Sequence, residues 1–168
     1  MKKMLVLAAA AILLCACARQ PEMEAPVRFY YPRKELSFQA GSDVLYPELR
    51  ESAGLENDLE ALLRLYLAGP ADGQSVSPFP AGTRLVDWKI EDSVLRITLS
   101  QEFARLSGLE LNIAAVCLAK TGMELTGAEA VELRVEEEML DGKSSLLLTP
   151  EQIRLLDDSS SLPTETSR

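Results

Sequence analysis

Apolar and charged residues are arranged at helical spacing in the middle of the chain, over residues 55–68. The apolar positions recur every three or four residues, so they fall on one side of a helix while the charged positions fall largely on the other. Gly69 and Pro70 follow; glycine can adopt the left-handed angle that closes a helix, whereas proline cannot continue it. The pattern predicts an amphipathic helix that ends at Gly69, followed by a loop as far as Thr83.

Strict alternation of apolar and polar residues, which is typical of strands, occurs on both sides of this helix. It predicts strands over residues 27–31, 44–50, 84–90, 94–99 and 130–136. Pro47 should confine the second of these strands to an edge or a bulge, because proline cannot donate a ladder hydrogen bond. The third and fourth strands flank the polar turn Glu91-Asp92-Ser93, so we expect them to form a hairpin at the centre of the sheet.

A second helical segment begins near Ser100 and runs to about Lys120, and Gly122 and Gly127 break its pattern. The elements then follow the order strand, strand, helix, strand, strand, helix, strand. This order indicates an α+β domain over residues 27–138. We expect two strand-strand-helix halves that share one mixed or antiparallel sheet.

Residues 139–156 are expected to add a short C-terminal hairpin and helix. Asp141-Gly142 is a pair typical of a two-residue hairpin turn. Thr149-Pro150-Glu151-Gln152 has the order of a capping box, with proline at the first helical position. The remaining residues, 157–168, combine Asp, Ser, Pro and Thr without apolar periodicity, so we expect a disordered tail there.

The start of the chain has the pattern of an export signal, because two lysines precede an apolar run too short to span a bilayer. The run ends in Leu14-Cys15-Ala16-Cys17, which resembles a bacterial lipobox. We therefore predict a lipoprotein signal peptide over residues 1–16, acylation of Cys17, and a flexible tether over 17–26. The chain would then be lipid-anchored at the extracytoplasmic side of the cell membrane. An ordinary secretory signal with an incidental cysteine is the alternative.

Composition limits the chemistry that the chain can perform. The formal net charge is −9, and an acidic surface of this kind makes nucleic acid and anionic lipid poor electrostatic partners. The absence of histidine removes the commonest general base and metal ligand. Cys117 lies in an apolar segment and is expected to be a small buried side chain. The carboxylates of residues 136–138 are typical of solvated charge, so we expect no enzyme, no metal site and no cofactor.

Several segments together resemble the GerMN domain, a family of sporulation and spore germination proteins. They are the strand end Tyr30-Tyr31-Pro32, the helix end Tyr66-Leu67-Ala68-Gly69-Pro70, the loop Ser77-Pro78-Phe79-Pro80-Ala81-Gly82-Thr83 and the corner Leu99-Ser100-Gln101-Glu102-Phe103. The resemblance covers about residues 27–138. It implies an α+β domain on an extracytoplasmic lipoprotein, with a part in envelope assembly or germination and an architecture similar to ring-building modules. It brings no agreed ligand and no catalytic residue.

The absence of a catalytic constellation favours a non-enzymatic interaction module that docks on another envelope protein or on itself. The candidate contact loop contains Gly69, Pro70, Pro78, Phe79, Pro80 and Gly82. Phe79 lies between two prolines in a loop, where apolar residues are less expected on the surface. The competing interpretation is that its ring packs the loop against the second helix and closes the core.

Peptidoglycan or glycan binding is the alternative function. Aromatic rings stack on sugars, and the chain offers the rings of Tyr30, Tyr31, Tyr46, Tyr66 and Trp88. Most of these residues occupy strand or helix positions that also suit a core. Aromatic residues make up only 5% of the chain, which makes an extended stacking surface less favourable.

Overall fold

A computed structural model of the chain describes residues 26–35 and 44–157. The predicted signal peptide, the lipid site Cys17, most of the tether and nearly all of the C-terminal tail lie outside these residues. None of the helices within the described ranges has the length and apolar character needed to cross a membrane.

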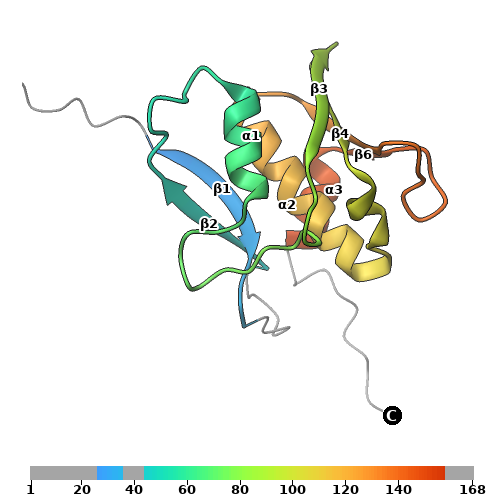
Figure 1. Ribbon diagram of the computed structural model, residues 1–168, viewed down its shortest axis with the longest axis horizontal. Helices are drawn as coiled ribbons and strands as arrows, with labels where there is room; N and C mark the ends of the chain where they lie inside the picture. Colours follow the sequence, from blue (N-terminus) through green and yellow to red (C-terminus); the bar gives the residue numbers. More distant parts are fainter. Residues whose placement is uncertain (1–25, 36–43, 158–168) are drawn as a thin grey trace, which may run out of the picture.

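The strands divide into two sheets (Figure 1). The first pairs β1 (Val27–Pro32) with β2 (Leu45–Arg50), and the second has the order β3 (Leu85–Glu91), β4 (Val94–Leu99), β5 (Ala130–Val135) and β6 (Leu146–Leu148). Strands β4 and β5 are parallel, and the other neighbours are antiparallel. The α+β class is confirmed, whereas the expected single shared sheet is wrong.

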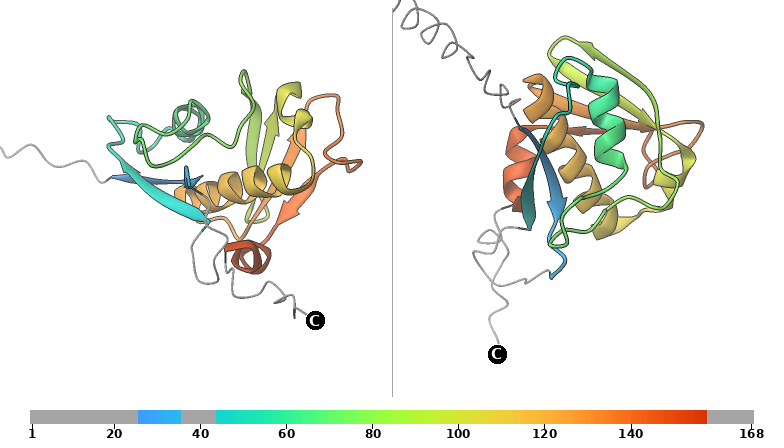
Figure 2. Two further views of the ribbon diagram at one scale, coloured as in Figure 1. Left: turned by 90° about the horizontal axis from the view of Figure 1, so that it is seen from below. Right: turned by 60° about the vertical axis from the view of Figure 1, so that its left-hand side comes forward.

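Helix α2 (Gly108–Thr126) separates the two sheets because it is apolar on more than one side. It contacts β1 on one side and β4, β5 and β6 on the other, and Figure 2 shows it at the centre of the domain. Thr121 is fully buried there, and its hydroxyl oxygen accepts a hydrogen bond from the Tyr30 backbone N–H at 2.9 Å. Because its buried residues face both sheets, α2 forms a layer between them and the two sheets do not join edge to edge.

Gly122 lies within α2, so the expectation that it ends the helix is wrong. A Cβ at this position would lie 2.8 Å from the Leu95 Cδ2 atom on β4, closer than packed carbons approach. Glycine therefore allows the helix to pack closely on the sheet. The helix ends instead at Gly127, whose φ of 69° is in the left-handed region. Its start also differs from the prediction, because a short 3-10 helix, η1 (Gln101–Arg105), comes first.

Helix α1 (Leu59–Leu67) begins later than the apolar pattern predicts. Asp58 caps its start, since the side chain accepts a hydrogen bond from the Ala61 backbone N–H at 2.9 Å. Residues 51–57 precede it as turns and irregular backbone. Gly69 follows the helix with φ +100°, which confirms the predicted glycine stop.

The hairpin of β3 and β4 is confirmed, and Asp92 and Ser93 form its turn with φ values of 51° and 61°. Its expected central position is wrong for β3, which is the outer strand of the sheet. Val86 and Ile90 on β3 are 43% and 48% exposed, as expected for apolar residues on an outer strand that is paired on one side only.

The C-terminal segment forms the predicted elements and packs on the domain. Leu140 and Lys143 exchange two backbone hydrogen bonds, of 2.8 and 3.0 Å, across the Asp141-Gly142 turn. Helix α3 (Pro150–Asp157) begins with the predicted box, in which Gln152 Oε1 accepts from the Thr149 backbone N–H at 3.0 Å. Leu148 and Ile153 belong to the same core as α2.

Candidate functional site

The six loop residues singled out in the sequence do not all face solvent, because Phe79 is buried. Gly69 and Pro70 lie at the end of α1, close to β2. Pro78, Phe79 and Pro80 lie beside the first turns of α2, where they line a hollow with Leu106, Glu110 and Ile113. Gly82 has φ +88°, and a Cβ there would contact the Glu102 side chain at 3.5 Å.

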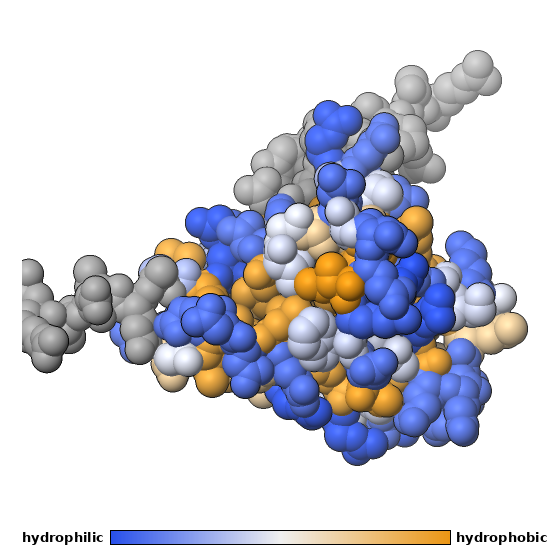
Figure 3. Space-filling view, turned by 90° about the horizontal axis from the view of Figure 1, so that it is seen from above, coloured by the Kyte–Doolittle hydropathy of each residue, from blue (hydrophilic) through white to orange (hydrophobic). Residues whose placement is uncertain are grey.

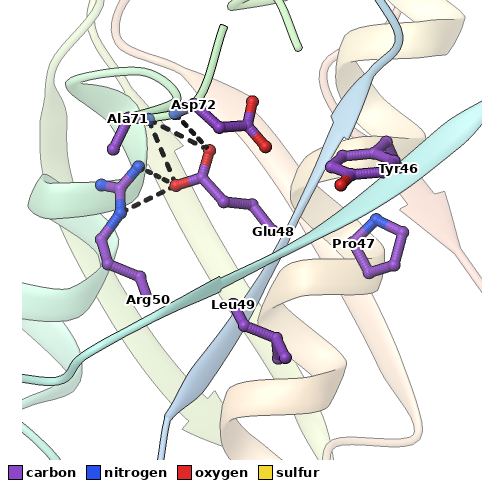
Figure 4. A pocket seen from close by; sticks show the side chains of 7 residues that line it. All are labelled: Tyr46, Pro47, Glu48, Leu49, Arg50, Ala71 and Asp72. Atoms are coloured by element: carbon purple, nitrogen blue, oxygen red, sulfur yellow. Dashed lines mark hydrogen bonds and ion pairs between the residues drawn. The ribbon is translucent and has the colours of Figure 1, made fainter. Parts of the chain in front are cut away.

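A nearly buried ion pair fastens the first part of the loop to β2 (Figure 4). Glu48 is 5% exposed, and its Oε1 accepts a hydrogen bond from Arg50 Nε at 2.9 Å. Its Oε2 accepts a hydrogen bond from the Ala71 backbone N–H at 3.0 Å, with a longer contact of 3.4 Å from that of Asp72. The carboxylate therefore holds two consecutive backbone groups just after the Gly69-Pro70 stop.

Arg50 connects the same carboxylate to the end of α1. Its Nη2 donates to the Gly69 carbonyl oxygen at 3.0 Å, and its Nη1 lies 3.4 Å from the Leu65 carbonyl oxygen. The last carbonyls of a helix have no intrahelical partner and carry partial negative charge, so a guanidinium is favourable there. The Arg50 guanidinium also lies over the Phe29 ring, with its Cζ atom 5.2 Å from the ring centroid.

The pair was missed at the sequence level because charged residues in an alternating strand usually face solvent. Glu48 and Arg50 are two residues apart, which places both side chains on one face of β2. The signal for this pair in the sequence is therefore two opposite charges on one face of a strand, together with the Gly-Pro stop that ends the following helix. A hollow of about 400 Å³ beside the pair is lined by Tyr46, Pro47, Glu48, Leu49, Arg50, Ala71 and Asp72. Its charged groups hold the protein's own backbone, which indicates a structural role.

Phe79 is a core residue. Its side chain is 8% exposed, and its ring centroid lies 5.3 Å from that of Tyr66 and 6.3 Å from that of Phe103. The ring is therefore turned away from any partner, as in the packing interpretation. The loop presents other groups to solvent, among them Val76, which is 40% exposed and lies beside the hollow of about 320 Å³ at α2.

Most aromatic rings considered for glycan stacking are buried. Tyr31 and Tyr66 are fully buried and Tyr30 is nearly so. The Tyr31 hydroxyl donates to the Tyr66 carbonyl oxygen and the Tyr66 hydroxyl donates to that of Tyr30, both at 2.7 Å. Burial raises the pKa of both phenols, Tyr31 and Tyr66. The two half-exposed rings, Tyr46 on β2 and Trp88 on β3, belong to different sheets, so they do not share a sheet face.

The outer face of the larger sheet carries ion pairs. Glu132 on β5 accepts hydrogen bonds from Arg134 at 2.8 Å and from Arg96 at 2.9 Å. Both interactions lower the pKa of the Glu132 carboxyl, and the hydrogen bond from Arg134 has the larger effect.

In residues 26–35 and 44–157, no three His, Cys, Asp or Glu side chains are grouped to hold a metal ion. Figure 3 shows apolar patches exposed between hydrophilic side chains on the face seen from above.

The chain matches the model of the Germane family, described as sporulation and spore germination, over residues 28–141. A Clostridium perfringens protein provisionally named a lipoprotein is 19% identical, with a TM-score of 0.47, over 76% of this chain and 89% of that one. The tandem GerMN domains of the sporulation protein GerM from Bacillus subtilis are 20% identical, with a TM-score of 0.49, over 71% of this chain and 39% of that one. Comparison with curated protein sequences gives no significant match. Because the family match spans more than half of the chain, this protein belongs to the Germane, or GerMN, family of sporulation and spore germination proteins.

Proposed function

We propose that this protein is a non-enzymatic interaction module, anchored to the cell membrane on its extracytoplasmic side, that acts in sporulation, germination or envelope assembly. Its partner would be another envelope protein or a second copy of itself. The observation that carries this proposal is the outer edge of β3, which presents exposed apolar side chains at the end of a sheet. Sheet edges and exposed apolar residues are surfaces through which proteins bind other proteins.

The loop over residues 69–83 contributes a second, preformed surface in this proposal. The Glu48–Arg50 pair and the buried ring of Phe79 hold it at its two ends. A surface held in this way loses little conformational entropy on binding, which favours protein contact. The carboxylates of Glu48 and Asp72, beside the first part of the loop, accept hydrogen bonds from the protein's own backbone, and this supports a binding role over a catalytic one.

The anchor is proposed at Cys17, on the strength of the motif Leu14-Cys15-Ala16-Cys17. Two acyl chains attached there would give lasting membrane binding. Replacing the cysteine, as Cys17→Ala, should move the full-length protein from the membrane fraction to the soluble extracytoplasmic fraction. Equal membrane recovery of both forms would contradict the anchor without affecting the proposed protein contact.

Crosslinking in intact cells, followed by mass spectrometry, tests the interaction itself. One dominant crosslinked envelope protein, or crosslinked copies of this chain, is the expected result. Co-sedimentation of the purified protein with peptidoglycan provides the comparison, and we expect the protein to remain in the supernatant. Sedimentation with peptidoglycan in the absence of any protein crosslink would overturn the proposal in favour of glycan binding.

A further inference from the structure

Strand β3 has an outer edge to which another strand can add. It is the first strand of the order β3-β4-β5-β6 and pairs only with β4 in the described part of the chain. Asp92 and Ser93 form a two-residue turn, so Glu91 and Val94 are the pair that exchanges backbone hydrogen bonds. Such pairs alternate along an antiparallel ladder. The backbone N–H and C=O groups of Ile90 and Trp88 therefore point away from β4, toward the open edge.

The sequence of this strand is complementary to itself. When two copies of β3 are placed antiparallel with Trp88 opposite Trp88, Asp87 faces Lys89 on each side of the centre. Residues directly opposite each other in an antiparallel pair lie on the same face of the sheet. The partly exposed Trp88 side chains of the two copies would meet on one face. The opposite charges would meet on the other face.

Charge also selects this register over its neighbours. Moving the two strands by one step in one direction places Asp87 opposite Asp87, and the other direction places Lys89 opposite Lys89 and Asp87 opposite Glu91. In a parallel, in-register pair, each charged residue would lie opposite the same residue of the other copy. Like charges directly opposite are destabilising, so among these arrangements the antiparallel register centred on Trp88 is the one that avoids repulsion. A register centred on Ile90 also avoids it, with Lys89 opposite Glu91, but it places Asp87 opposite Ser93 and so makes no use of the Asp87 charge.

Two features of β3 that often protect edge strands are compatible with this pairing. The irregularity between Leu85 and Asp87 limits regular pairing to the part of the strand that follows it. The contact is therefore short, and its charged pairs contribute a large share of the binding energy. Lys89 already lies 3.0 Å from Glu91, but both side chains are about half exposed. An exposed ion pair of this kind contributes little stability, so the ammonium is available to a second carboxylate.

We propose that two copies of this protein pair through β3, antiparallel, with a two-fold axis at Trp88. The pairing joins the two four-stranded sheets edge to edge. Two-fold symmetry gives two Asp87 to Lys89 contacts, one on each side of the Trp88 pair. This inference rests on the proposed interaction function and identifies a second copy of the chain as its partner.

The test uses two full-length copies that carry different tags and are produced in the same bacterial cells. After crosslinking in intact cells, one tag is captured and the recovery of the other is measured. Asp87→Lys in both copies, or Lys89→Asp in both copies, creates two like-charge contacts, so recovery should fall by about tenfold or more. Both residues are exposed, so the fold should be unaffected, and circular dichroism checks this.

Restoration of pairing is the decisive result. A copy with Asp87→Lys and a copy with Lys89→Asp bring only opposite charges together, so their combination should recover the wild-type level. The double variant Asp87→Lys/Lys89→Asp should also pair with itself. Glu51→Lys and Lys143→Asp change exposed charges away from β3 and should leave recovery unchanged.

Several outcomes would overturn the inference. Unchanged recovery with either single variant, or no restoration in the mixed pair, excludes the β3 register. Absence of wild-type self-recovery, together with a crosslink to another envelope protein, refutes the self-pairing and leaves the proposed function intact. Absence of both the self-crosslink and the crosslink to another envelope protein refutes the self-pairing and the proposed function together.

Discussion

Replacing Glu48 by alanine should destabilise the domain far more than replacing Glu60, although both carboxylates pair with an arginine. The Glu48 and Arg50 side chains are 5% and 15% exposed, whereas those of Glu60 and Arg64 are 52% and 53% exposed. The two pairs therefore differ mainly in their access to water. Removing a buried partner leaves an uncompensated charge and unpaired backbone groups, while removing an exposed one leaves groups that water solvates.

The magnitude follows from what remains after Glu48→Ala. Breaking a buried ion pair costs about 3–5 kcal/mol, and the Ala71 N–H at 3.0 Å loses its acceptor as well. Arg50 keeps its hydrogen bond to the Gly69 carbonyl oxygen, and its partial exposure admits water. We therefore expect a loss of unfolding free energy at the lower end, about 3 kcal/mol. Glu60→Ala should cost about 0.3–0.5 kcal/mol, as for other exposed helix pairs.

Urea unfolding of the purified protein measures the difference. The Glu48→Ala variant should unfold at a clearly lower urea midpoint with an unchanged slope, and Glu60→Ala should lower the midpoint only slightly. Glu48→Gln, which keeps the shape and one acceptor oxygen, should fall between them. If Glu48→Ala shifts the midpoint no more than Glu60→Ala does, the ion pair does not hold the loop to β2.

Three further predictions concern the core and the helix ends. Burial raises the pKa of Tyr31 and Tyr66. Their stabilising contribution is therefore complete below the ordinary phenol pKa of about 10 and is lost as the pH rises above it. The urea midpoint should fall at alkaline pH, and less steeply in Tyr31→Phe; equal pH profiles would contradict this. Gly122→Val should cost about 1–3 kcal/mol, because a Cβ there lies 2.8 Å from a methyl carbon on β4, whereas the open site Gly73 should tolerate valine in the same thermal unfolding assay. Asp58→Ala should remove the cap of α1 and cost about 1 kcal/mol, with Asp58→Asn close to the wild type; a neutral alanine variant would exclude the capping role.

Local signals in the sequence predict local structure well in this protein. Gly69 ends α1 and Asp141-Gly142 makes a two-residue turn, because each requires a backbone angle that few residues adopt. Alternation of apolar residues locates the strands. It does not state which strands share a sheet, and α2 separates them because its apolar residues face both sheets. Gly122 illustrates the same limit. In the sequence, a glycine that makes room for a neighbouring side chain cannot be distinguished from a glycine that ends a helix.

The candidate site was harder to predict because it depends on contacts between distant segments. An apolar residue between two prolines fits an exposed contact or a core position equally well, and only the position of Phe79 beside Tyr66 decides between them. Glu48 appears solvated in the sequence until the loop after Gly69 brings its backbone N–H groups to the carboxylate. The complementarity of β3 was present in the sequence, but it acquires meaning only once β3 is known to be an outer strand.

Crosslinking in living cells, with the masses and sites of the products identified, tests whether this protein is a membrane-anchored interaction module. We expect the full-length protein to form protein crosslinks in the membrane fraction, and the Cys17→Ala form to lose both the membrane location and most of the crosslinks. Crosslinked residues should lie on β3 or on the loop over residues 69–83. A wild-type protein that remains uncrosslinked, or that is recovered only with peptidoglycan, would show that it does not act by binding other envelope proteins.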